Sequence, residues 1–336
     1  IPSGATLAHY YERKNQAAIN VALRLISSGE YGGENTNTLK LLVSASLPLL
    51  RLSDKKASSQ WPYWRPKTDL TSRNPVIVMR TKAKAIKKAS EWLLENLDPK
   101  SISDLENYLQ LHNVAVQSLV PAFLKAELAD VVITDPPYSD QAPYLEYSSL
   151  WIQLLGLELP NDAYKYEIVK TDAPTRVQDT QEYMLRLGDG FKNCARMLKP
   201  NGILVWFYQD HSVQHWATLD KQARKNRLRI VEVIPMPKQR RSMKTVTSPG
   251  KTLDGDLILV FRKEEQPPRV SITSQQAIHL LREKQESLPL EISYFDRYAA
   301  IIEVGLKHHL MSVLAKRYTD IRDILKSMGD NNVLAP

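Results

Sequence analysis

The 336-residue sequence has little cysteine and little glycine. Its single cysteine, Cys194, cannot form a disulfide within the chain, and one thiol excludes a cysteine-rich zinc site. This usage is typical of a reducing compartment, so we expect a cytoplasmic protein. The 12 glycines are about half the average number, which matters wherever a fold needs a glycine-rich loop.

Long apolar runs are absent as well. The longest, residues 39–50, includes Ser44, Ser46 and Pro48 and is too short to span a bilayer. The N-terminus has neither region of a secretory signal, and it begins Ile1-Pro2 rather than with methionine. We therefore expect no membrane association, and a first residue that is not the native start.

The charge of the chain is moderately positive. Lys and Arg number 45 against 37 Asp and Glu, which gives a net charge of +8. This excess favours a polyanionic partner such as nucleic acid, although a charge of this size can also serve solubility alone. The seven histidines form no metal-ligand pattern with acidic residues, so we expect no metal site.

The sequence divides into three regions. Residues 1–112 are typical of a mainly helical region, residues 113–265 of an α/β core, and residues 266–336, after the linker-like Gln266-Pro267-Pro268, of a C-terminal helical segment. The first region is expected to contain helices at 6–27, 38–52 and 82–96 and a short strand at 75–79.

The α/β core alternates strands with helices. Strands are expected at 114–118, 129–134, 203–208, 230–234 and 256–261, with helices at 143–156, 180–198 and 213–226 and a tight turn at 199–202. This order indicates an α/β sheet that ends in a hairpin. Because residues 129–134 (ADVVIT) are almost continuously apolar, we expect a strand that is buried on both faces.

The motif Asp135-Pro136-Pro137-Tyr138 directly follows that strand. Open α/β sheets bind their ligands at the carboxyl ends of strands, so this position favours a functional site. The structural alternative is a proline-rich turn that contains a buried tyrosine.

The motif and its surroundings resemble the amino-group DNA methyltransferases, whose adenine-N6 subgroup typically has DPPY. The similarity covers about residues 113–263 and includes TDPPYSDQAPYLEYSSLWIQLLG, ARMLKPNGILVWFYQD and GDLILVF, with a weaker likeness in YYERKNQAAINVAL. The resemblance implies a Rossmann-like class I methyltransferase sheet, S-adenosylmethionine as cofactor, DNA as partner, and a role in restriction–modification or phage defence.

The residue types of the motif suit transfer of a methyl group to an amine. The exocyclic amine of adenine is a poor nucleophile because its lone pair is delocalised into the ring. Asp135 and the Pro136 carbonyl can accept its two N–H groups, and the rigid prolines, including Pro137, offer no competing donor. Tyr138 can stack on the extruded base. No cysteine nucleophile is needed, and Cys194 is expected in the core, which argues against a cytosine-C5 methyltransferase.

Basic residues offer candidate contacts to DNA. The loop between the last two strands carries Lys238, Arg240, Arg241 and Lys244, which could contact phosphates or could simply be solvated. A helix face with Lys82, Lys84, Lys87 and Lys88 has the same two interpretations. Weaker candidates, which follow the strand at 203–208, are Asp210, His211 and His215.

A methyltransferase of this fold also needs a glycine-rich loop and an acidic residue that bind S-adenosylmethionine, and neither is found. The only G-x-G, Gly188-Asp189-Gly190, lies within a helical pattern. The cofactor-binding residues are therefore unknown, and we expect a sheet that lacks its first strands and leaves residues 129–134 with an unpaired apolar edge.

Three explanations of this gap remain open. The cofactor half could lie upstream, as the Ile1 start suggests, or a second chain could supply it, or it could be degenerate. Other acceptors also remain open: cytosine N4, an RNA base or a protein glutamine. Asp as the first motif residue favours adenine. The alternative from another class is a non-catalytic DNA-binding subunit.

Overall fold

The protein is described here by a computed structural model. It describes residues 9–29, 33–54, 70–98, 114–118, 128–138, 144–159, 163–171, 178–237, 255–267, 272–289 and 291–328, together with residues 100, 104, 109, 112 and 253. The chain divides into two compact units, the first comprising Ile1–Asn113 and Pro143–Ala163, and the second Val114–Ala142 and Tyr164–Pro336.

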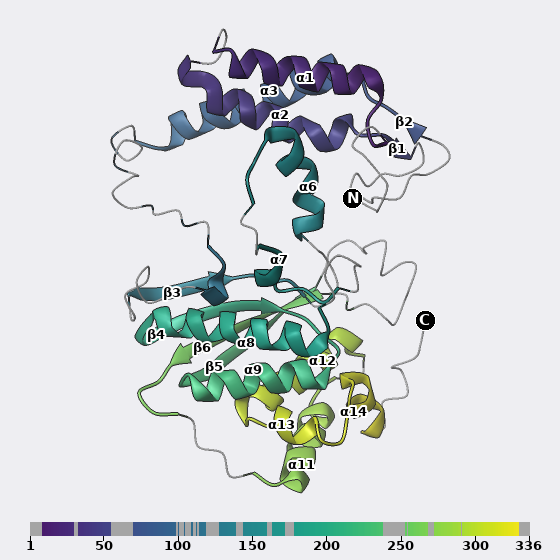
Figure 1. Ribbon diagram of the computed structural model, residues 1–336. Coiled ribbons are helices and arrows are strands. Elements are labelled where there is room, and N and C mark those ends of the chain that lie inside the picture. The colour runs from purple at the N-terminus through teal and green to yellow at the C-terminus, as the bar shows by residue number, and fades with distance from the viewer. Residues whose placement is uncertain are drawn as a thin grey trace. The chain divides into compact units, whose positions relative to one another are not determined.

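The first unit is mainly helical (Figure 1). Its elements are α1 (Arg13–Ser27), α2 (Thr36–Leu50), α3 (Pro75–Asn96), α6 (Tyr144–Leu155) and a small antiparallel pair, β1 (Ser53–Asp54) and β2 (Leu70–Thr71). Its small core includes Ile19, Leu47 and Leu150, all essentially inaccessible to solvent. The buried Asn15 amide donates a 2.7 Å hydrogen bond to the Leu50 carbonyl at the end of α2, which joins α1 to α2.

Two expectations for this unit are corrected. Residues 75–79 form the first turns of α3 rather than a strand, because the Asn74 side chain accepts hydrogen bonds from Val76 N and Ile77 N and Pro75 occupies the first turn. This capping outweighs the strand preference of the β-branched residues. The first helix begins at Arg13 rather than at residue 6, because Glu12 before it has extended backbone angles, φ −65° and ψ 146°.

The second unit contains a four-stranded mixed sheet. In the order β3-β4-β6-β5, it comprises β3 (Ala129–Thr134), β4 (Leu198–Tyr208), β6 (Gly255–Lys263) and β5 (Leu228–Pro237). β3 is parallel to β4, and α8 (Thr180–Met197) lies between them in the chain, as a parallel crossover requires. The other two pairs are antiparallel. The predicted α/β class and the terminal hairpin are confirmed.

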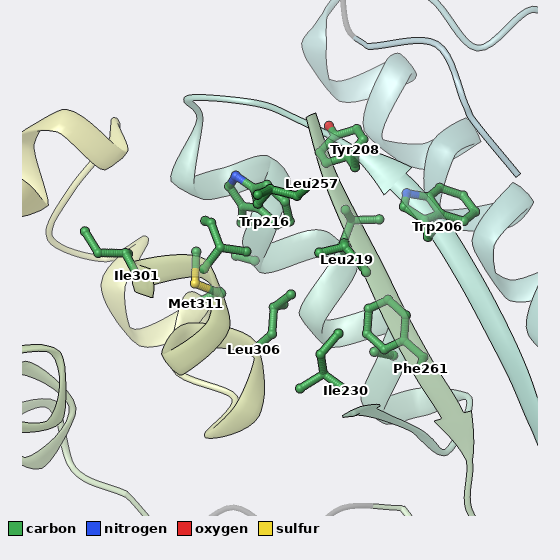
Figure 2. Packing of buried hydrophobic residues seen from close by; sticks show 14 of the residues in the cluster. Trp206, Tyr208, Trp216, Leu219, Ile230, Leu257, Phe261, Ile301, Leu306 and Met311 are labelled. Atoms are coloured by element: carbon green, nitrogen blue, oxygen red, sulfur yellow. The ribbon is translucent and has the colours of Figure 1, made fainter. Parts of the chain in front are cut away.

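One face of this sheet packs into the main core. Leu204, Trp206 and Tyr208 alternate along β4, and their neighbours on β6 are Leu257, Leu259 and Phe261. Tyr208 meets Trp216 of α9 (Val213–Lys225) edge to face, with ring centroids 5.2 Å apart, and Figure 2 shows both among buried residues that include Trp206, Leu219 and Phe261. Each fully buried aromatic side chain removes about 150–250 Å² from water, so these residues dominate the stability of the unit.

The C-terminal helices share this core. They are α11 (Ser274–Glu286), α12 (Tyr294–Lys307), α13 (Met311–Leu314) and α14 (Ile321–Ser327). Ile301, Leu306 and Met311 belong to the same buried cluster as the sheet (Figure 2). The helices are therefore part of the hydrophobic core that supports the sheet.

The expectation that both faces of residues 129–134 are buried is wrong. In the described part of the chain, β3 is an edge strand with β4 as its one neighbour. Val131 is 52% exposed and Ile133 is 69% exposed, whereas Val132 between them is buried. Within the described residues, the sheet therefore ends at an edge strand that has one apolar face exposed.

Two shorter segments also differ from expectation. Residues 116–118 form a 3-10 turn instead of part of a strand, because the Asn193 side chain donates to the Val116 and Gln117 carbonyls. The segment 199–202, which was expected to be a tight turn, lies within β4, and Asn201 is in the left-handed region at φ 64°.

No helix among the described residues has both the length and the apolar character that a membrane span needs.

Candidate active site

The DPPY motif leaves the sheet at the carboxyl end of β3, because Asp135 follows directly on Thr134. Asp135 is exposed, Pro136 is buried, and Pro137 and Tyr138 are half-buried. The carboxylate is therefore accessible, while the backbone behind it is held in the protein. This is the edge at which open α/β sheets place their ligands.

Tyr138 lies against Asp135. Its hydroxyl donates a 2.7 Å hydrogen bond to Oδ1 of the carboxylate. Its ring meets the ring of Tyr208 edge to face, with centroids 5.7 Å apart and an interplanar angle of 88°. The carboxylate and the aromatic ring of the motif thus face one another.

Two buried tyrosines contact the motif. Tyr183 on α8 donates a hydrogen bond of 3.1 Å to the Pro137 carbonyl. Its hydroxyl also lies 3.3 Å from the hydroxyl of Tyr208, the last residue of β4. Neither side chain is accessible to solvent. Neither residue stands out in the sequence, because a tyrosine in an apolar pattern is indistinguishable from an ordinary core residue.

Asp210 connects these tyrosines to α9. Its Oδ2 accepts a 3.2 Å hydrogen bond from the Tyr208 hydroxyl and is hydrogen-bonded to Nδ1 of His215. Its Oδ1 accepts from the Ser212 N–H at 2.7 Å, and its carbonyl accepts from the Trp216 indole at 2.8 Å. The structure therefore links Asp210 and His215 to the DPPY motif through Tyr208 and Tyr183.

Burial controls the ionisation of this network. It raises the pKa of Tyr208 well above that of a free phenol, and the nearby Tyr183 and Asp210 raise it further. The phenol therefore stays protonated and remains a donor to Asp210. Burial also lowers the pKa of His211, with Arg322 adding to the effect, which favours the neutral imidazole.

Cys194 lies in the core, as expected. It is only 4% exposed, and burial raises the pKa of its thiol to about 11. Because the thiolate is the nucleophilic form, this residue is not an activated nucleophile at neutral pH.

The described residues supply no glycine-rich loop of the kind that binds S-adenosylmethionine after a strand. Gly188 and Gly190 both lie inside α8, where a Cβ on Gly190 would come within 3.2 Å of Val116 Cγ1. These glycines allow close packing of a helix and make no loop after a strand. Beside β3, where further strands would lie, the described chain supplies none.

The candidate DNA contacts are only partly described. Lys238, Arg240, Arg241 and Lys244 lie outside the described residues. On α3, Lys84, Lys87 and Lys88 are exposed and Lys82 is half-buried. In the part of the chain that the structure describes, no three His, Cys, Asp or Glu residues are grouped as metal ligands.

An α/β sheet with D-P-P-Y at the carboxyl end of a strand parallel to its neighbour is the arrangement that the resemblance to the methyltransferase class implies. The profile of the N6/N4 DNA methylase family matches residues 129–320, from the first residue of β3 to the start of α14. The chain belongs to this family of DNA methylases. No curated protein matches the sequence significantly.

Among solved structures, the chain is similar to a Thermus thermophilus protein assigned as a DNA modification methylase. One structure has 13% sequence identity and a TM-score of 0.26, and the match covers 62% of this chain and 97% of the Thermus thermophilus chain. A second, complexed with S-adenosyl-L-methionine, shares 13% identity over 61% and 95%, with a TM-score of 0.25. The third structure is a selenomethionine derivative with 15% sequence identity and a TM-score of 0.26. The match covers 49% of this chain and 60% of the Thermus thermophilus chain. These scores are too low to transfer any geometry.

Proposed function

We propose that this chain provides the amine-binding site of an enzyme that methylates N6 of adenine in DNA. The observation that carries the proposal is the accessible Asp135 carboxylate facing Tyr138 at the carboxyl end of β3. Membership of the N6/N4 DNA methylase family supports the reaction class. The choice of adenine rests on Asp as the first residue of the motif.

The proposed role of the motif is to hold the amino group. Asp135 accepts one N–H and the Pro136 carbonyl accepts the other, which leaves the nitrogen lone pair directed away from both acceptors. A carboxylate has several acceptor positions, so Oδ2 can bind the amine while Oδ1 keeps its bond to Tyr138. Stacking of the base on Tyr138 returns about 1–3 kcal/mol of the energy spent in extruding it.

The methyl donor of the proposed reaction is S-adenosylmethionine, and we infer that another part of the enzyme binds it, because the described residues supply no glycine-rich loop after a strand. We infer that a strand of that part pairs with the free edge of β3, either from another segment of the same protein or from a second chain. Two observations support this arrangement: within the described residues β3 has a neighbouring strand on one side alone, and its exposed Val131 and Ile133 form an apolar surface that further elements could cover. We expect weak or no binding of S-adenosylmethionine to the present chain alone.

We further propose that the enzyme acts in the cytoplasm of a prokaryote, in restriction–modification or phage defence. The basic residues Lys238, Arg240, Arg241 and Lys244 would contact DNA phosphates beside the extruded base. The rival acceptors are cytosine N4, an RNA base and a protein glutamine. The alternative from another class is a DNA-binding subunit without catalysis.

The test is methylation of an adenine-containing duplex, with and without the cofactor-binding part. Asp135→Ala should abolish methylation while DNA binding persists, because the variant loses an acceptor for the amine but no DNA-facing cation. The matched control is Asp130→Ala, which removes an exposed carboxylate from the same strand, paired with Lys199 at 2.8 Å. Methylation that survives the double change Asp135→Ala and Tyr138→Ala would refute the assigned site. Methylation of cytosine alone would assign the chain to the N4 reaction.

A further inference from the structure

The residues that hold the DPPY motif in place lie outside the motif itself. Tyr138 is fixed at three points: its hydroxyl bonds to Asp135, its ring contacts Tyr208, and the carbonyl of the preceding residue, Pro137, accepts from Tyr183. The last two contacts come from adjacent buried side chains, one on α8 and one at the end of β4. Both contacts act on the peptide and ring of Tyr138.

We propose that Tyr183 is a positioning residue of the methyl-transfer site, and that Tyr208 and Asp210 hold its side chain next to the motif. This inference rests on the proposed function, since it concerns the orientation of the ring on which the base stacks. Tyr183 and Tyr208 themselves are inaccessible to solvent, so neither contacts a substrate.

The direction of the hydrogen bonds follows from counting protons. Each phenol has one proton, and the Tyr208 hydroxyl donates its own to the Asp210 carboxylate, which cannot donate in return. The Tyr208 oxygen can then only accept. Tyr183 can donate its own proton to the Pro137 carbonyl at 3.1 Å or to the Tyr208 oxygen at 3.3 Å. The shorter contact is the one to the motif.

Asp210 is itself held in place from several elements. His215 and Trp216 contact it from α9, and the Tyr298 hydroxyl on α12 donates to its carbonyl at 2.8 Å. Asp210 is thus fixed by the α/β core and by the C-terminal helices together. The chain of contacts from Asp210 through Tyr208 and Tyr183 to Pro137 transmits that rigidity to the exposed end of β3.

The decisive variant is Tyr183→Phe, which keeps the buried ring and removes only the hydroxyl. The molecule offers a matched control in its first unit, where the buried Tyr11 hydroxyl donates to the Leu47 carbonyl at the same 3.1 Å distance. Tyr11→Phe removes a buried tyrosine-to-carbonyl hydrogen bond of the same length, and Tyr11 is distant in sequence from the DPPY motif. A comparison of the two variants therefore separates loss of a buried hydrogen bond in general from loss of the bond to Pro137.

The first measurement needs neither DNA nor cofactor. We would place 3-fluorotyrosine at position 138 of the full chain and record its fluorine NMR signal. Tyr183→Phe should shift or broaden this signal, and Tyr11→Phe should leave it unchanged. Should Tyr183→Phe fail to fold, Tyr208→Phe serves instead. It leaves Tyr183 with the Pro137 carbonyl as its acceptor, so the signal should stay as sharp as in the wild-type chain, and a broadened signal would overturn the proposal. An unaltered signal in a folded Tyr183→Phe protein would overturn the proposal.

The second measurement is methylation by the complete enzyme. Tyr183→Phe should lower kcat by about 3- to 10-fold, the loss of one hydrogen bond, with KM for DNA changed by less than about twofold. Tyr11→Phe should leave both constants unchanged. An equal loss in the two variants would indicate a merely structural role. If the complete wild-type enzyme does not methylate DNA, the proposed function fails, and the fluorine signal still decides whether Tyr183 positions Tyr138.

Discussion

Tyr138 donates its hydroxyl proton to Asp135 at 2.7 Å, so the aromatic ring and the carboxylate of the motif are joined before any base arrives. Two properties of Tyr138 can therefore be separated: its ring, on which a base can stack, and its hydroxyl, which occupies one oxygen of Asp135. Variants that remove one or both distinguish their contributions.

Tyr138→Phe should retain methylation within about threefold, because phenylalanine keeps the stacking surface. Tyr138→Ala should lower kcat/KM by about 5- to 150-fold, which corresponds to the loss of about 1–3 kcal/mol of base stacking. Steady-state methylation of a duplex containing adenine measures both. Equal losses for the two variants would mean that the hydroxyl, rather than stacking, is what the reaction needs.

The exposed face of the edge strand β3 should affect how strongly the protein associates with itself. Ile133→Lys adds a charge to an exposed position, so it should change the free energy of unfolding by about 0.5 kcal/mol or less and reduce self-association. Val132→Lys, one residue away, places the charge on the buried face and should cost about 3 kcal/mol or more. Chemical denaturation and sedimentation velocity measure the two effects. Comparable destabilisation by both changes would show that the exposed face of β3 is covered.

A buried hydrogen bond between His309 and Asp220 joins α9 to the segment after α12. His309 Nδ1 lies 2.6 Å from Asp220 Oδ1, and both side chains are buried. His309→Ala removes the partner of a buried carboxylate and should destabilise the protein by about 3–5 kcal/mol. His279→Ala breaks an exposed pair with Glu283 and should cost about 1 kcal/mol or less. Urea denaturation of the two variants checks the difference.

The pH dependence of His309→Ala follows from the same pair. Burial raises the pKa of Asp220, and His309 opposes that effect, so the variant should raise this pKa further. At pH values between the pKa of Asp220 in the unfolded state and its higher pKa in the folded state, the folded protein binds more protons than the unfolded protein. Stability therefore falls as pH rises through this window, and the variant should regain stability as pH is lowered. Adding Asp220→Asn should remove this contribution to the slope; a slope unaffected by that addition contradicts the assignment.

Cys194 should be unreactive in the folded protein. Its pKa, raised from 9.0 to about 11, leaves about a hundredfold less thiolate at pH 8 than an unperturbed thiol has, and its burial also blocks reagents. Ellman's reagent should label the chain rapidly in denaturant and far more slowly without it. Rapid stoichiometric labelling of the native protein would place the thiol at the surface.

The basic loop is tested by salt dependence. Replacing Arg240 and Arg241 by alanine should weaken DNA binding and flatten the slope of log K against log salt by up to about two units, one for each lost phosphate contact. Replacing Lys87 and Lys88 on α3 removes the same charge elsewhere. An unchanged slope for the arginine pair, with a changed slope for the lysine pair, would move the phosphate contacts to α3.

Most of the secondary structure of the α/β core was predictable because it depends on local patterns. Residues 129–134, 203–208 and 256–261 are runs of apolar and β-branched residues, and each lies within a strand. The segment at 75–79 was predicted wrongly because its β-branched residues favour a strand, whereas Asn74 and Pro75 together begin a helix. The Asn74-Pro75 cap, like the strand preference of the residues after it, is a pattern of neighbouring residues, so it could have been recognised from the sequence.

By itself, the sequence determined the DPPY motif, its position after a strand and the lack of a glycine-rich loop, since these are properties of neighbouring residues. The sequence also predicted the unpaired edge of ADVVIT, but only the tertiary structure decided that one face of this strand is exposed, because exposure depends on which other elements pack against it. It also brought Tyr183 and Tyr208 to Pro137 and Tyr138. Tyr183 is 46 positions along the chain from Pro137, and Tyr208 lies further still, so no short-range pattern could have paired them with the motif.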